Sequence, residues 1–246
     1  QLGSNSISSS VLQSPNDQLN ALTTGKDGSI YLGGNTYGNL DGQANSGGDD
    51  AFVTKYKPDG TKVWTRLVGS SVPSESANGI TIGLDGSVYI GGTANGSIDG
   101  QAYIGLGDAF VTKFSPDGTK LWTRLFGAGS TESYESVKSL TTGLDGFIYA
   151  CGFTNGSLDG QSNNGYFDAF VTKYNPDGTK VWTRLIGASS YDTANALTVG
   201  VDGAIYVGGN TNGGVFDSIQ NNSTAGFISK FSPDGTKLWT KLNLNT

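Results

Sequence analysis

Apolar and polar residues alternate in short runs along most of the chain. In the stretch DAFVTKYNPDGTKVWTRL, Asp168 to Leu185, the residues Phe170, Thr172 and Tyr174 fall on one face of an extended strand. A Pro-Asp-Gly turn at 176–178 separates this run from the next, and Asp-Gly between two alternating runs is a strong β-hairpin signal. The pattern predicts a chain built from β-hairpins.

Two hairpin phrases recur four times in step. One phrase carries a Trp at positions 64, 122, 182 and 239, with spacings of 58, 60 and 57 residues, and the other begins at Ala21, Gly79, Ser139 and Ala196. Each repeat therefore has two hairpins and four strands, which is typical of a propeller blade. The predicted fold is an all-β propeller of four four-stranded blades, one for each ~58-residue repeat. Because the first and last copies look like the middle ones, a closed ring is favoured over a capped solenoid.

Small residues indicate the phase of the blades. Ala21 and its counterparts are small enough for a strand near a narrow axis, so this strand is predicted to be innermost. The prediction is an N-terminal extension over 1–15 and one domain over 16–246. Its blades are expected at about 16–69, 74–127, 133–187 and 191–243. In the alternative phase, the N-terminal hairpin completes a blade that begins at the C-terminus.

Composition narrows the functional classes. Charged residues make up 15% of the chain and its formal net charge is -6, so no clustered basic face is expected to bind nucleic acid. No apolar run approaches the ~20 residues of a membrane span, and membrane insertion is not expected. The absence of Met leads us to expect that a leader preceded Gln1.

The absence of His argues against an enzyme. It excludes a Ser-His-Asp triad, a Cys-His dyad and a His-ligated zinc site. The single Cys, Cys151, stands where other copies have Gly, so it is interpreted as a small buried residue. A carboxylate-dependent glycan-cleaving enzyme is the remaining catalytic alternative. It needs two carboxylates in different environments, whereas repeated carboxylates have similar ones.

The repeated sequence motifs resemble those of a known family. The phrase DAFVTKYxPDGTKxWTRLxG followed by DGxxYxGGxTNGxxDG is similar to the bacterial SBBP repeat, named for a predicted seven-bladed β-propeller, and the hairpin order resembles NHL-type blades. The resemblance extends from about Asn16 to Asn243 and implies a secreted or cell-surface bacterial protein without catalytic residues. Four repeats in place of seven imply either a small ring or a ring completed by other chains.

Two sets of acidic residues are candidate metal ligands. The first set stands ten residues before the Asp of each first hairpin: Asp17, Glu75, Glu135 and Asp192. Four carboxylates near the axis would favour a hard cation such as calcium, although each could instead pair with Arg66, Arg124, Arg184 or Lys241. The second set, in the Asp-Gly-Gln loops, is Asp41, Asp99 and Asp159, which either bind calcium or cap their own turns. The sequence requires no cofactor, and calcium is the candidate cation.

Aromatic residues on variable loops are candidate ligand-binding residues: Tyr37, Tyr103, Tyr166, Phe167 and Phe216. Aromatic side chains on the loops of a rigid scaffold often form recognition surfaces, and they also seal gaps between blades. The sequence therefore predicts a non-enzymatic extracellular or cell-surface binding or adhesion module for a glycan or a surface or matrix protein. The alternative is a structural module that self-associates in a surface layer, fibre or appendage.

Overall fold

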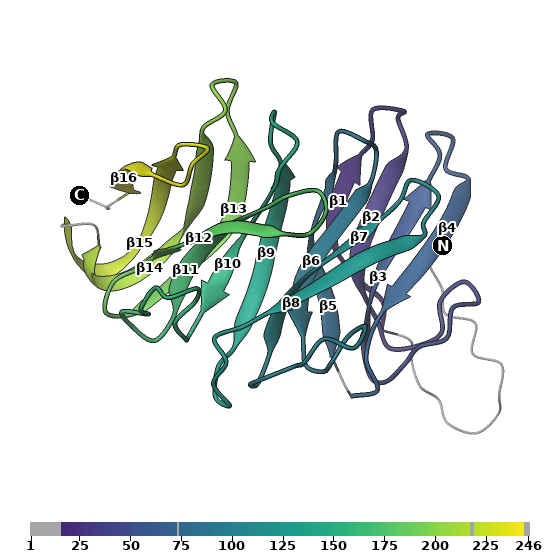
Figure 1. The fold of residues 1–246 in the computed structure, drawn as a ribbon, viewed down its shortest axis with the longest axis horizontal. Coiled ribbons are helices and arrows are strands. Elements are labelled where there is room, and N and C mark those ends of the chain that lie inside the picture. Colours follow the sequence, from purple (N-terminus) through teal and green to yellow (C-terminus); the bar gives the residue numbers. More distant parts are fainter. Residues whose placement is uncertain (1–15, 73, 217–218, 244–246) are drawn as a thin grey trace. The chain divides into compact units, whose positions relative to one another are not determined.

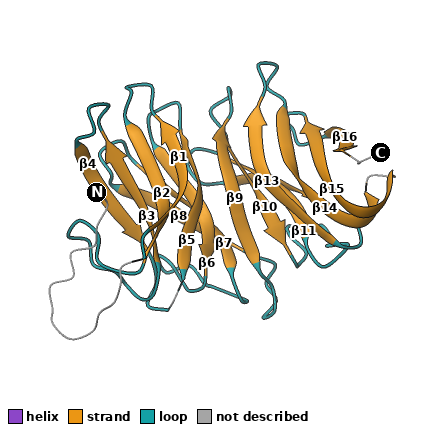
Figure 2. Ribbon diagram, turned by 180° about the vertical axis from the view of Figure 1, so that it is seen from behind, coloured by secondary structure: helices purple, strands orange, loops and turns teal. Residues whose placement is uncertain are grey.

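The computed structural model describes residues 16–72, 74–216 and 219–243, and the predicted extension over 1–15 lies outside them. Every regular element in these ranges is a β-strand (Figure 2). Since the described residues hold no helix, none of them forms a helix long and apolar enough to cross a membrane. The predicted all-β class is confirmed.

Each repeat forms one four-stranded antiparallel sheet with its strands in chain order (Figure 1). The first two sheets contain β1 Gln18–Thr24, β2 Ile30–Thr36, β3 Asp50–Tyr56, β4 Lys62–Val68, β5 Glu75–Ile82, β6 Val88–Ala94, β7 Asp108–Phe114 and β8 Lys120–Phe126. The last two contain β9 Glu135–Thr142, β10 Ile148–Thr154, β11 Asp168–Tyr174, β12 Lys180–Ile186, β13 Tyr191–Val199, β14 Ile205–Phe216, β15 Ile219–Phe231 and β16 Lys237–Asn243. The four four-stranded blades predicted from the repeats are thus present, while closure of a ring stays a prediction.

Glycine and aspartate shape the hairpins locally. In the first hairpin Gly28 has a φ of 77°, which a glycine adopts without strain, and Asp27 Oδ1 accepts a hydrogen bond of 3.0 Å from the Ser29 N–H. The first strand of each sheet bulges against the second, as between Ala77 and Gly79. A Cβ at Gly92, opposite this bulge, would collide with the Ser76 carbonyl. The second glycine of the Gly-Gly pair is therefore needed for close strand contact inside the sheet.

The chain divides into two compact units. Unit 1 runs to Tyr103 and includes Phe110–Leu125, and unit 2 comprises Ile104–Ala109 and the residues from Phe126 onward. Each unit holds two successive sheets, apart from the β7 and β8 residues at the division.

The repeated Trp packs between the two sheets of a unit. In unit 1 the Trp64 ring lies 6.5 Å from that of Phe114 in β7, and its indole N–H donates to the Pro116 carbonyl at 3.2 Å. In unit 2 the Trp182 indole N–H donates to the Pro233 carbonyl, also at 3.2 Å. The predicted packing role of the Trp is confirmed at these two positions.

Candidate functional site

The Asp-Gly-Gln loops hold the last strand of their own sheet. Asp159 has a φ of 50°, and its carboxylate accepts hydrogen bonds from Lys180 Nζ at 2.7 and 2.8 Å and from the Thr183 hydroxyl. Asp99 accepts hydrogen bonds from Lys120 and Thr123 in the same way, and Asp41 accepts them from Lys62 and Thr65. The predicted loop carboxylates are thus engaged by protein donors, and their role as calcium ligands stays a prediction.

The Gln of two of these loops has a role that the sequence did not reveal. The Gln161 amide nitrogen donates to the Thr183 carbonyl, and its amide oxygen accepts from the Leu185 N–H at 3.2 Å. Gln101 makes the equivalent pair of bonds to Thr123 and Leu125. One side chain therefore occupies hydrogen-bonding positions that a fifth strand would use. The recurrence of Gln after Asp-Gly was the available signal.

Acidic residues from successive repeats meet at the junctions between sheets. The pair at the unit 1 junction is Asp50 and Glu75, and the pairs in unit 2 are Asp108 with Glu135 and Asp168 with Asp192. In each case a main-chain bond of 2.7 Å runs from the N–H of the second acid to the carbonyl that precedes the first. Sequence reasoning predicted only the second acid of each pair, because its partner lies in the preceding repeat.

The other predicted partners are engaged elsewhere. Arg66 Nε and Arg184 Nε donate to the Gly118 and Gly235 carbonyls at 2.7 and 2.8 Å. Asp17 accepts a 2.6 Å hydrogen bond from the Thr36 hydroxyl. The ion-pair alternative therefore does not describe Arg66 and Arg184.

Burial and mutual repulsion disfavour the charged form of these carboxyl groups. Burial, with added repulsion from Asp108, raises the pKa of Glu135 to about 7. Burial, with added repulsion from Asp192, raises the pKa of Asp168 to about 6. A Cβ placed on Gly127 would lie 2.7 Å from both Asp108 Oδ1 and Glu135 Oε2, so only glycine leaves room for this pair.

Five aromatic rings form a contiguous group in unit 2, which we call the aromatic ridge. Its members, in order of contact, are Tyr134, Phe153, Phe167, Tyr191 and Tyr166. Tyr166 and Tyr191 stack with their ring centroids 5.1 Å apart and their planes 8° apart. Tyr166 is 67% exposed and Tyr191 is 47% exposed, so solvent reaches both stacked rings.

The ridge brings together only part of the predicted aromatic set. Tyr166 and Phe167 belong to it, whereas Tyr37 and Tyr103 lie in unit 1 on the loops after β2 and β6. Phe216 ends β14, and its side chain is outside those that the structure describes.

The members that sequence reasoning missed had a signal in the repeats. Tyr191 and Tyr134 directly precede the repeated acid, where the other copies have Asn16 and Ser74. Phe153 stands where the other copies have Asn35, Thr93 and Asn210. The ridge is therefore specific to one part of the chain and is not required by the common blade architecture.

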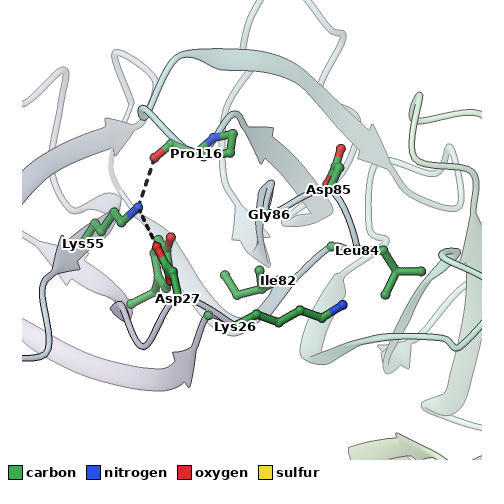
Figure 3. A pocket seen from close by; sticks show the side chains of 11 residues that line it. Lys26, Asp27, Lys55, Ile82, Leu84, Asp85, Gly86 and Pro116 are labelled. Carbon is green, nitrogen blue, oxygen red and sulfur yellow. Dashed lines mark hydrogen bonds and ion pairs between the residues drawn. The ribbon is translucent and has the colours of Figure 1, made fainter.

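A pocket of about 270 Å³ in unit 1 is lined by the turns of three hairpins (Figure 3). Lys55 crosses it, donating to the Pro116 carbonyl at 3.4 Å and lying 3.7 Å from the Asp27 carboxylate. In unit 2, Lys173 contacts Asp145 and the Pro233 carbonyl in the same manner, each at 3.0 Å. The groups in this pocket recur with the fold, so we interpret them as structural.

Comparison with known proteins agrees with the repeat architecture. Residues 181–217, which cover most of β12 and all of β13 and β14, match the family model described as SBBP, Beta-propeller repeat. Residues 181–217 therefore match one SBBP β-propeller repeat. The resemblance inferred from the repeated phrases is confirmed.

One relative and one solved structure also match the chain. It is 29% identical over 214 residues to "Regulatory protein FlaEY" of Caulobacter vibrioides, a match that covers 76% of this chain and 22% of the length of that relative. A crystal structure of a protein of unknown function from Bacteroides caccae aligns with a TM-score of 0.37 and 11% identity, covering 92% of this chain and 82% of that chain. At that score the structural likeness supports no conclusion.

Proposed function

We propose that this SBBP-repeat chain is a non-enzymatic binding module and that the aromatic ridge of unit 2 binds a glycan. The observation that carries the proposal is the exposed, stacked pair Tyr166 and Tyr191. Flat aromatic faces match the C–H faces of sugar rings, and tyrosine adds a hydroxyl that can bond to sugar hydroxyls. We also propose that the module acts outside the cell or at its surface.

Pre-organisation of the loop supports the proposal. The Asn163 side chain donates to the Thr154 carbonyl and accepts from the Gly165 N–H, both at 3.0 Å. The Tyr166 N–H donates to the Ser190 carbonyl at 3.0 Å. Since the loop beneath the stacked rings is already held in place, binding would require little ordering of the main chain.

The edge of the ridge provides polar groups of a suitable kind. Asn164 is exposed beside Tyr166, and Lys138 Nζ lies 5.3 Å from the centre of the Phe153 ring. Amide and ammonium donors next to aromatic faces would orient sugar hydroxyls. The "regulatory" description of the Caulobacter relative names no ligand, and it is compatible with a binding role.

The test is a glycan array followed by calorimetry on the strongest ligand. We expect Tyr166→Ala and Tyr191→Ala each to weaken binding at least about tenfold. Each variant removes an aromatic ring whose apolar surface the glycan would bury, and that burial would stabilise the complex. Tyr37→Ala is the matched control, since it removes an exposed tyrosine from unit 1. Equal affinity in all three variants would exclude the ridge, and failure of the intact chain to bind any glycan would refute the proposed ligand class.

A further inference from the structure

The junction of β11, β13 and β14 in unit 2 contains three buried oxygen atoms without hydrogen-bond partners among the described residues. They are Asp168 Oδ1, Asp192 Oδ1 and Thr211 Oγ1, and all three residues are 0% exposed. Asp192 and Thr211 face each other directly across the β13–β14 pair. Buried oxygen atoms without partners carry a large desolvation cost, which a bound ligand would offset.

Each carboxylate at this junction is fixed through its other oxygen. Asp168 Oδ2 accepts from the Asn164 N–H at 3.0 Å, and Asp192 Oδ2 accepts from the Ala188 N–H at 2.7 Å. The main chain therefore fixes the Oδ2 atom of each carboxylate, while each Oδ1 atom has no hydrogen-bond partner among the described residues. This arrangement leaves one coordinating atom of each carboxylate available.

The third oxygen belongs to a hydroxyl that lies beside Asp192. Two carboxylates and a hydroxyl, all oxygen donors, form the type of ligand set preferred by hard divalent cations.

We propose that Asp168, Asp192 and Thr211 bind a divalent cation, with calcium the best match to their oxygen donors. The described residues contain no cluster of three or more His, Cys, Asp or Glu side chains, and here the third ligand is a hydroxyl. Calcium accepts irregular coordination completed by main-chain oxygens or water. The cation neutralises the repulsion between two carboxylates and joins the third repeat to the fourth.

The equivalent junction with Asp108 and Glu135 lacks the third ligand. There the Thr154 hydroxyl donates to Glu135 Oε1 at 2.7 Å, so it is already engaged. The cation is therefore assigned to the Asp168–Asp192 junction, where the Thr211 hydroxyl has no hydrogen-bond partner among the residues that the structure describes.

The test uses the whole chain, Tb³⁺ luminescence and competition by Ca²⁺. Tyr191 directly precedes Asp192 and can transfer excitation to a bound Tb³⁺. We expect saturable luminescence that Ca²⁺ displaces, and at least a tenfold loss of Tb³⁺ affinity in Asp168→Asn and Asp192→Asn. Binding should also raise the Tm of the intact chain in Ca²⁺ relative to EDTA, because a ligand that binds only the folded state stabilises it.

Two controls keep the result interpretable. Glu132→Gln removes an exposed carboxylate from the same unit and should retain the affinity of the unchanged chain. Both Asn variants are nearly isosteric and remove repulsion, so they are expected to fold and to show the same Tm in Ca²⁺ and EDTA. Absence of saturable binding to the unchanged chain, or equal affinity in the Asn variants, would overturn the proposal. Glycan binding is not needed for either readout.

Discussion

At two sheet junctions, a glycine is needed because the Cβ atom of any other residue would collide with a buried carboxylate. Gly127 and Gly187 follow the last strand of their sheets, and a Cβ at either would collide with Asp108 or Asp168. The fourth repeat has Ala225 in place of the Asp and Leu244 in place of the Gly. The Gly and the Asp are lost together, which is expected if the glycine exists to make room for the carboxylate.

Glu135 leads to a prediction about pH. Its pKa is about 7 in the folded chain against an ordinary value of 4.5, so the folded state binds more protons than the unfolded state between these values. Stability should therefore fall as pH rises from about 4.5 to above 7 and be unaffected by this group below that range. In Glu135→Gln this fall should be absent, giving a gain of about 1 to 3 kcal/mol at pH 8 and none at pH 4.5.

Urea unfolding of both proteins at the two pH values measures the effect. Glu132→Gln supplies the control, because its exposed carboxylate should leave the pH profile unchanged. A profile for Glu135→Gln that parallels the unchanged chain would show that Glu135 is not held in its neutral form.

At the scale of the element, one glutamine side chain covers part of the outer strand in the second and third sheets. Outer strands expose main-chain groups that can pair with another molecule. Gln161 covers the Thr183 carbonyl and the Leu185 N–H of β12, while Asp159 fixes the Thr183 side chain. We call this loop an edge cap. Its function in the sheet gives a structural reason for the recurrence of Asp-Gly-Gln in this chain.

Removing the cap should destabilise the sheet and promote association. We expect Gln161→Leu to lower the free energy of unfolding by about 1 to 3 kcal/mol, because two main-chain groups lose their partners. Urea unfolding measures this loss, and light scattering at rising concentration should show oligomers that the unchanged chain does not form. Ser162→Ala, at the neighbouring exposed position, is the control. Unchanged stability and scattering would mean that water replaces the amide without cost.

At the scale of the whole molecule, the sequence predicted local features and repeat number well. Asp-Gly turns and the Trp spacing predicted hairpins and four sheets because both depend on residues close together in the chain. The pairing of Asp168 with Asp192 could not be predicted, since it joins two repeats through packing. Tyr166 was found from its variable loop, whereas Tyr191 begins a strand and Phe153 lies within one, where aromatic residues usually indicate core.

The repeated Trp allows a test that bears on the whole molecule. Trp64 is 8% exposed between two sheets, whereas Trp239 is 37% exposed. We expect Trp64→Ala to cost about 3 to 5 kcal/mol in the free energy of unfolding, and Trp239→Ala clearly less. Denaturant unfolding of both variants gives the comparison. Equal losses would contradict this expectation.

The edge cap also bears on how four near-identical repeats avoid exchanging strands. Interchangeable sequences favour misassembly, because a strand of one copy can complete the sheet of another copy or another chain. Gln161 lies only 22 residues before Thr183, the residue whose carbonyl it covers. A partner on so short a tether reaches the edge at high effective concentration, ahead of strands from elsewhere. A repeat with such a loop can thus complete its own sheet, and duplication of that repeat can lengthen a chain without strand exchange between its copies.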